Sequence, residues 1–301
     1  MSKILVTLGD SVHWGQGLVR AHKLHWLVFS ELFKTHPGLQ DHLFAHSGAT
    51  IGIGATVTRQ RVDGEVPIAY PTILEQVQGF VANPGDVLAV LVNGGINDVD
   101  IRNILNPTVS PKTLAALIEE YCYDSMRVLL ETICRRFDNP GTRIVLTPYY
   151  PILSPLSKPF GIPWLLANEG LALPPNIDLA SGTNILVAKC MQFWKESHKH
   201  LRQAANEVNA GLSQPRVTFA DPGFTENNAV FAGEPWLFGL KNDPFFSPQD
   251  EVVNERRAAC NLAFPPHEFP SREQCYRASA GHPNVEGARR YAAAISAAIG
   301  V

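Results

Sequence analysis

Charge is scarce in this chain. Charged side chains make up 18% of its 301 residues, whereas soluble domains usually carry about 25%. The 25 basic and 28 acidic residues nearly cancel and leave a net charge of −3. The chain therefore has no strong positive field that would attract nucleic acid or an anionic membrane. Because 45% of the residues are hydrophobic, the composition also excludes a disordered chain.

Long apolar runs are missing as well. No run reaches the ~18 residues that a membrane-spanning helix needs. The short apolar stretch at residues 1–8 ends at a Gly-Asp pair and is typical of a first strand rather than of a signal peptide. The sequence predicts no transmembrane segment and a cytoplasmic protein, with non-classical export as the alternative. It does not predict an oligomeric state.

Cysteine is the third scarce residue. The five cysteines are an odd number and lack the spacing of a metal site, so we expect neither a metal nor another cofactor. Cys260 and Cys275 flank a proline-rich loop. They are either two free thiols or a disulfide pair.

What the chain does contain is an alternation of strand-like and helical patterns. Three of the strand-like segments are almost continuously apolar, which is typical of strands buried on both faces of a parallel sheet. Helical patterns at about 18–32, 73–80, 111–137, 181–212 and 283–299 separate or follow them. This order predicts an α/β fold, a three-layer α/β/α sandwich with right-handed crossovers. The five predicted strands are Ile4–Leu8, Leu43–His46, Val87–Val92, Arg143–Thr147 and Arg216–Ala220.

Two long stretches interrupt the alternation, at about 149–180 and 222–280, and both are rich in proline and aromatic residues. We interpret them as loop insertions in one domain that covers residues 1–301. Long loops that follow the carboxyl ends of strands usually serve function. Their apolar side chains either wall a substrate pocket or pack on each other over the sheet edge. The candidate pocket residues are Trp14, Phe160, Trp164, Leu165, Trp236 and Phe238.

Four short blocks place reactive residue types at strand ends or before the last helix. Ser11, in Gly9-Asp10-Ser11, directly follows the first strand, where its hydroxyl can act as a nucleophile and its N–H can bind an oxyanion. Gly48 and Asn97 follow the next two strands and can add a backbone and a side-chain donor. His282 precedes a proline that keeps it outside the last helix, and an imidazole there can take the serine proton.

Each block alone has an ordinary explanation as a helix cap or a turn. As an ordered set, the four blocks resemble the SGNH hydrolase (GDSL esterase/lipase) superfamily over residues 9 to about 290. This resemblance implies a flavodoxin-like fold with a five-stranded parallel sheet and ester hydrolysis through an acyl-serine. It implies Ser11 as the nucleophile and His282 as the base. The oxyanion donors would be the N–H groups of Ser11 and Gly48 and the side chain of Asn97.

The chain departs from the superfamily three residues before the histidine. The usual residue there is an aspartate, which orients the imidazole and stabilises its cation; here it is Ser279. We therefore expect a Ser-His dyad. The partner of the imidazole Nδ1 would be a backbone carbonyl near Ser279, or a carboxylate from elsewhere in the chain.

The expected substrate is a small-molecule or lipid ester, and the apolar insertions favour acyl chains. An O-acetyl esterase acting on glycans is the alternative enzyme. A binding protein that keeps the fold without turnover is the non-enzymatic alternative, and Ser279 is the residue that favours it. Retention of Ser11, Asn97 and His282 together favours the enzyme.

Overall fold

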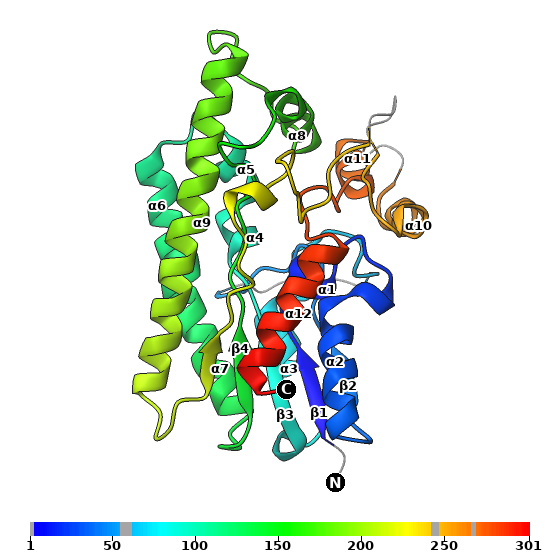
Figure 1. Ribbon diagram of the computed structural model, residues 1–301, viewed down its shortest axis with the longest axis vertical. Helices are drawn as coiled ribbons and strands as arrows, with labels where there is room; N and C mark the ends of the chain where they lie inside the picture. Colours follow the sequence, from blue (N-terminus) through cyan, green and yellow to red (C-terminus); the bar gives the residue numbers. More distant parts are fainter. Residues whose placement is uncertain (1–2, 55–61, 242–246, 266–268) are drawn as a thin grey trace.

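The computed structural model describes residues 3–54, 62–241, 247–265 and 269–301 (Figure 1). At its centre lies a five-stranded, all-parallel sheet with the strand order β2-β1-β3-β4-β5. Because β1 and β3 hold the middle of the sheet, their carboxyl ends adjoin the point where the strand order reverses. The predicted α/β class and sheet are confirmed. The strands are β1 (Ile4–Thr7), β2 (Gln40–Leu43), β3 (Val87–Val92), β4 (Arg143–Leu146) and β5 (Val217–Phe219).

The second strand does not lie where the sequence predicts it. The prediction was Leu43–His46, whereas the strand is Gln40–Leu43. β2 is an edge strand with exposed and half-buried side chains, so it lacks the apolar run that marks the buried strands. Residues 44–47 instead form the connection that leads to Gly48.

Helices cover both faces of the sheet (Figure 1). α2 (Leu24–Thr35) and α12 (Val285–Ile299) pack on each other on one face. α3 (Ile73–Gln78) and α7 (Met126–Arg136) lie on the opposite face. The 32-residue α9 (Leu179–Ala210) runs along β5, α7 and α6 (Pro111–Glu119). A π-helical segment, Glu120–Ser125, joins α6 to α7 inside the long helix predicted for this region.

The two insertions are not simply loops, as the sequence suggested. They hold α8 (Ile162–Asn168), α10 (Val253–Ala263) and α11 (Phe269–Tyr276). These helices are only 7 to 11 residues long, and proline lies in the first turn of α8, so they show no sustained apolar periodicity. The first insertion begins directly after β4 and the second directly after β5.

A disulfide joins Cys260 on α10 to Cys275 on α11, which settles the alternative left open for these two residues. With Val66 they form a small buried cluster beside the main core around the sheet. In Figure 1 the start of β1 and the end of α12 lie toward the end of the molecule opposite α8, α10 and α11. None of the helices in the described ranges is long and apolar enough to cross a membrane.

Candidate active site

A tight turn after β1 presents Ser11. Gly9 has φ +135°, and a Cβ at this position would lie 2.0 Å from the side-chain oxygen of Asn93, so only glycine fits. Asp10 then caps the four-residue helix α1 (Ser11–Trp14) by accepting a hydrogen bond from the N–H of Val12 at 2.9 Å. The serine hydroxyl is thereby placed at the carboxyl end of a central strand.

Asp10 is fully buried beneath this turn. Its carboxylate accepts hydrogen bonds of 2.6 Å each from the Tyr149 hydroxyl and the Asn93 side-chain amide. Burial raises the pKa of Asp10, and the hydrogen bond from Tyr149 partly opposes that effect. These bonds join the ends of β1, β3 and β4. The carboxylate therefore positions the turn and is not free to act as a base.

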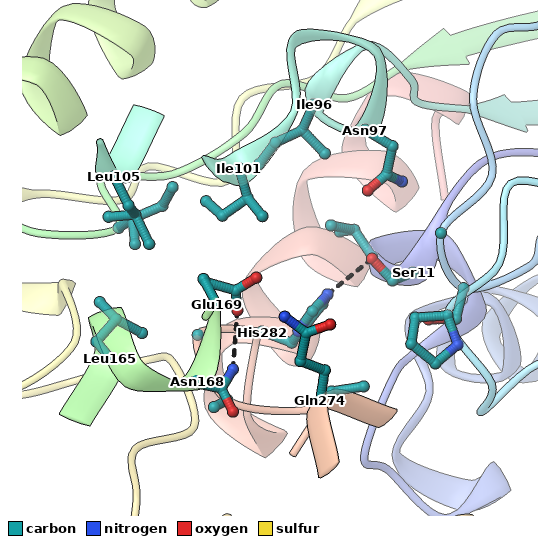
Figure 2. Close-up of a pocket in the computed structure, with 18 of the residues that line it drawn as sticks. Ser11, Ile96, Asn97, Ile101, Leu105, Leu165, Asn168, Glu169, Gln274 and His282 are labelled. Atoms are coloured by element: carbon teal, nitrogen blue, oxygen red, sulfur yellow. Dashed lines mark hydrogen bonds between the residues drawn. The ribbon is translucent and has the colours of Figure 1, made fainter. Parts of the chain in front are cut away.

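His282 reaches the same sheet edge from the loop before α12. The segment around Phe238 pairs with this loop, because the Phe238 N–H donates to the His282 carbonyl at 2.7 Å and the Gly281 N–H donates to the Phe238 carbonyl at 2.8 Å. Nε2 of His282 lies 2.7 Å from Oγ of Ser11 (Figure 2). The two side chains, 271 positions apart in the sequence, thus form a hydrogen-bonded nucleophile–base geometry.

The imidazole of His282 is desolvated. Burial lowers the pKa of His282 to about 4; the backbone of Ala280 partly opposes this, and the positive charge of Arg256 adds to it. Nδ1 is buried without a hydrogen-bond partner among the described residues. No described aspartate or glutamate hydrogen-bonds to the ring. His282 is therefore neutral at pH 7.

The side chain of Ser279 does not orient His282, which corrects the sequence-based suggestion. Ser279 is fully buried, and its hydroxyl donates to the carboxylate of Asp250. A carboxylate is a stronger acceptor than a neutral imidazole nitrogen, so this geometry directs the hydroxyl away from His282. The backbone of Ser279, like that of Ala280, raises the pKa of His282 against the effect of burial.

Asp250 belongs to a buried ionic network behind the site. The fully buried guanidinium of Arg256 pairs with Asp250 and lies 3.5 Å from a carboxylate oxygen of Glu65. Lys23 lies 3.8 Å from Glu65, so two acidic and two basic side chains balance each other. Because its charge is compensated by Arg256, Asp250 does not supply the free negative charge that the usual triad aspartate brings to the histidine.

Three hydrogen-bond donors come from residues that line the same cavity as the Ser11 hydroxyl. Within the described ranges, the backbone N–H groups of Ser11 and Gly48 make no hydrogen bond. Gly48 has φ +79°, and a Cβ there would lie 2.6 Å from the backbone nitrogen of Ile68. The side-chain amide of Asn97 donates one hydrogen bond to the Ala49 carbonyl at 2.9 Å, which leaves its second hydrogen available. Ser11, Gly48, Asn97 and His282 all line one cavity.

This cavity has a volume of about 230 Å³ and two different sides. In Figure 2 apolar side chains from α4 (Ile96–Val99) and α5 (Ile101–Leu105) lie across from the polar side chains of α8 and α11. The Ser11–His282 pair lies at one end. The apolar side comprises Ile96, Ile101 and Leu105, and the side across from it comprises Asn168, Glu169 and Gln274, with Leu165 next to Asn168 on α8.

Of the six pocket residues suggested by the sequence, the structure places only Leu165 at this cavity. Phe160 and Trp164 are 68% and 44% exposed and line a second cavity with Phe231 and Leu237. The first insertion therefore faces Ser11 through other residues.

The remaining three aromatic residues have structural surroundings. The Trp14 indole donates to Glu65 at 2.9 Å and carries the Lys23 ammonium 3.6 Å above its ring. Trp236 packs edge-on against Phe224, with ring centroids 5.1 Å apart. Phe238 is buried and holds the His282 loop through its backbone. The aromatic residues of the second insertion thus support the histidine loop, whereas Gln274 on α11 is the side chain through which this insertion reaches the cavity.

Sequence reasoning missed the polar lining of the cavity. Asn168 and Glu169 lie at the end of a short helix inside an insertion whose sequence is mostly apolar. Gln274 lies on a helix that the sequence did not predict. The one indication of this polar lining in the sequence is Glu169, an acidic residue that closely follows the apolar run Leu165-Leu166-Ala167. Among the residues that the structure describes, no group of three or more His, Cys, Asp or Glu side chains could hold a metal ion.

The chain is similar in structure to several solved esterases and lipases. No protein-family model and no curated protein matches it. A lipase from a goat rumen metagenome aligns at 14% identity with a TM-score of 0.49, over 99% of this chain and 97% of the other. An acetylxylan esterase from Geobacillus stearothermophilus aligns at 16% identity with a TM-score of 0.45, over 100% and 96%. A protein described as a GDSL-like lipase, from Parabacteroides merdae, aligns at 13% identity with a TM-score of 0.44, over 100% and 97%.

Proposed function

We propose that this protein is a serine esterase that hydrolyses carboxylic esters through an acyl-serine intermediate. The observation that carries this proposal is the 2.7 Å contact between Ser11 Oγ and His282 Nε2 beside two unbonded backbone N–H groups. A binding protein has no use for a nucleophile, a neutral base and free donors gathered at one point.

The acylation step begins with attack of Ser11 Oγ on the ester carbonyl carbon, while His282 Nε2 takes the hydroxyl proton. The carbonyl oxygen becomes an oxyanion that accepts hydrogen bonds from the N–H groups of Ser11 and Gly48 and from the Asn97 amide. The imidazolium then returns its proton to the departing alcohol oxygen. The product is the acyl-serine and a free alcohol.

Deacylation repeats the same steps with water. His282 takes a proton from a water molecule, which attacks the acyl carbon, and the imidazolium gives this proton to Ser11 Oγ as the carboxylic acid leaves. No free carboxylate stabilises the imidazolium, so we propose a Ser-His dyad. A base with a pKa of about 4 accepts a proton less readily than one near 7, and the turnover should be lower than that of a complete triad.

The cavity favours short acyl groups. Its volume of about 230 Å³ lies below the ~300 Å³ at which the usual range of ligand sites begins. Of the substrate classes considered from the sequence, acetyl and other short esters therefore fit better than long lipid chains. The same small volume suits an O-acetyl esterase.

The test combines active-site labelling with a series of esters of increasing acyl length. We expect a fluorophosphonate to label the protein but not Ser11→Ala, and both Ser11→Ala and His282→Ala to lose at least about 10³-fold in kcat. Folded protein that is not labelled at Ser11 would show that the esterase proposal is wrong and favour the binding protein. Faster cleavage of acetate than of octanoate would support the short-acyl assignment, and the reverse order would favour a lipase.

A further inference from the structure

The polar side of the cavity contains a carboxylate that is only partly satisfied. The side-chain amide of Asn168 donates to one oxygen of Glu169 at 2.8 Å. The other oxygen makes no hydrogen bond with a described residue, and in Figure 2 it points toward the side of the cavity where Ser11 lies. One acceptor is therefore directed into the space that a substrate would fill.

A nearby cation compensates this carboxylate only in part: the charge of Arg102 lowers the pKa of Glu169 but does not outweigh burial. Among the described residues Glu169 forms no ion pair, and the nearby Arg102 is bound to Asp100 at 2.6 Å. Burial raises the pKa of Glu169, and the hydrogen bond from Asn168 opposes that effect. A half-buried carboxylate with one hydrogen bond gains from an additional donor, and a substrate bound in the cavity can supply that donor.

Two neutral amides accompany the carboxylate. Asn168 is 4% exposed, and its side-chain oxygen is buried without a hydrogen-bond partner in the described part of the chain. The Gln274 amide lines the cavity and makes no hydrogen bond there. Its N–H₂ needs an acceptor, whereas its oxygen and Glu169 need donors. A hydroxyl group is both donor and acceptor and satisfies this set, while an ammonium group would leave the amide N–H₂ unpaired.

We propose that the polar side formed by Asn168, Glu169 and Gln274 binds the hydroxyl groups of the alcohol portion of the substrate, so that the preferred substrates are short acyl esters of a polyol. This inference rests on the proposed esterase function and assigns its substrate class. The apolar side chains opposite, such as Ile101 and Leu105, would contact the carbon skeleton.

The test compares two acetate esters that differ only in hydroxyl groups, 2,3-dihydroxypropyl acetate and propyl acetate. We expect kcat/KM for the diol ester to exceed that for propyl acetate by about tenfold or more. A hydrogen bond to a charged group contributes a free energy that corresponds to at least this change in the rate. Glu169→Ala should reduce this ratio toward one. Glu119→Ala, which removes an exposed glutamate on α6, should keep the wild-type ratio.

A binding measurement separates this inference from the esterase proposal. In the inactive Ser11→Ala variant, adding Glu169→Ala should weaken binding of the diol ester, followed by NMR titration, by about tenfold. Unchanged affinity would overturn the inference even if no ester is cleaved. Serine-dependent cleavage without any diol preference would overturn it and leave the esterase standing. Faster cleavage of acetylcholine, the acetate ester of choline, than of the diol ester would overturn the inference and show a cation site instead. Comparing kcat/KM for an acetylated methyl glucoside with that for the diol ester distinguishes sugar-like from glycerol-like polyols.

Discussion

The desolvated imidazole of His282 determines how the proposed chemistry depends on pH. General-base catalysis needs the neutral ring, and burial lowers the pKa of His282 to about 4. We therefore expect kcat/KM for a short ester to stay constant from pH 8 to about 5 and to fall by half near pH 4. An ordinary histidine would give the same fall near pH 6.5.

The control for this pH profile is a check that the protein remains folded at each pH. Because the pKa is lowered in the folded protein, the unfolded chain binds the extra proton first. The folded state therefore loses stability as the pH falls from about 6.5 toward 4. Circular dichroism at each pH should show folded protein wherever activity is measured. An inflection of kcat/KM near 6.5 in folded protein would contradict the assignment of a buried, unpaired base.

At the scale of elements, the turn between β2 and α3 positions one of the proposed oxyanion donors. An alanine at Gly48 must adopt φ +79°, and its Cβ would approach the Ile68 backbone nitrogen at 2.6 Å. We expect Gly48→Ala to shift this N–H and to lower kcat by about 10²-fold, measured on the same ester. The conformational cost of the positive φ itself is about 1–2 kcal/mol.

Gly38 offers a matched comparison for this substitution. It also has a positive φ, of +88°, but no atom lies within 4 Å of a Cβ built there, and it precedes β2 at the opposite end of the strand. Gly38→Ala should carry a similar conformational cost and keep full activity. Equal activity of the two variants would show that close approach at Gly48 is not needed.

Much of the element structure could be predicted from the sequence, because β1, β3 and β4 are buried on both faces and read as apolar runs. The predicted position of β2 is wrong because this edge strand has polar, partly exposed side chains and therefore lacks the apolar run that marks a buried strand. Ser11, Gly48, Asn97 and His282 follow strand ends or precede a helix, and the order of these four blocks along the chain, rather than any one block, made them candidates. Glu169 and Gln274 meet them only through the packing of α8 and α11, which no local pattern encodes.

At the scale of the whole molecule, Arg256 holds together segments that are distant in the sequence. Its guanidinium pairs with Asp250 and Glu65 and donates to the Tyr276 carbonyl at 3.0 Å. Arg256→Met would leave two buried carboxylates without this cation. We expect the free energy of unfolding to fall by about 3–5 kcal/mol, measured by urea denaturation at pH 7.

Arg289→Met is the comparison for this loss, since Arg289 is 61% exposed at the side chain and lies 3.9 Å from Glu286. Loss of this surface pair should change the free energy of unfolding by no more than about 0.5 kcal/mol. Similar values for the two variants would mean that the buried network contributes no more than a surface ion pair.

The start of β1 and the end of α12 lie toward the end of the molecule opposite α8, α10 and α11 (Figure 1). α12 starts just after His282 and leads away from it over 15 residues, or roughly 22 Å. An affinity handle at either terminus can therefore be fixed to a solid support while the cavity faces the solution. Immobilised protein should thus accept soluble esters as freely as protein in solution does.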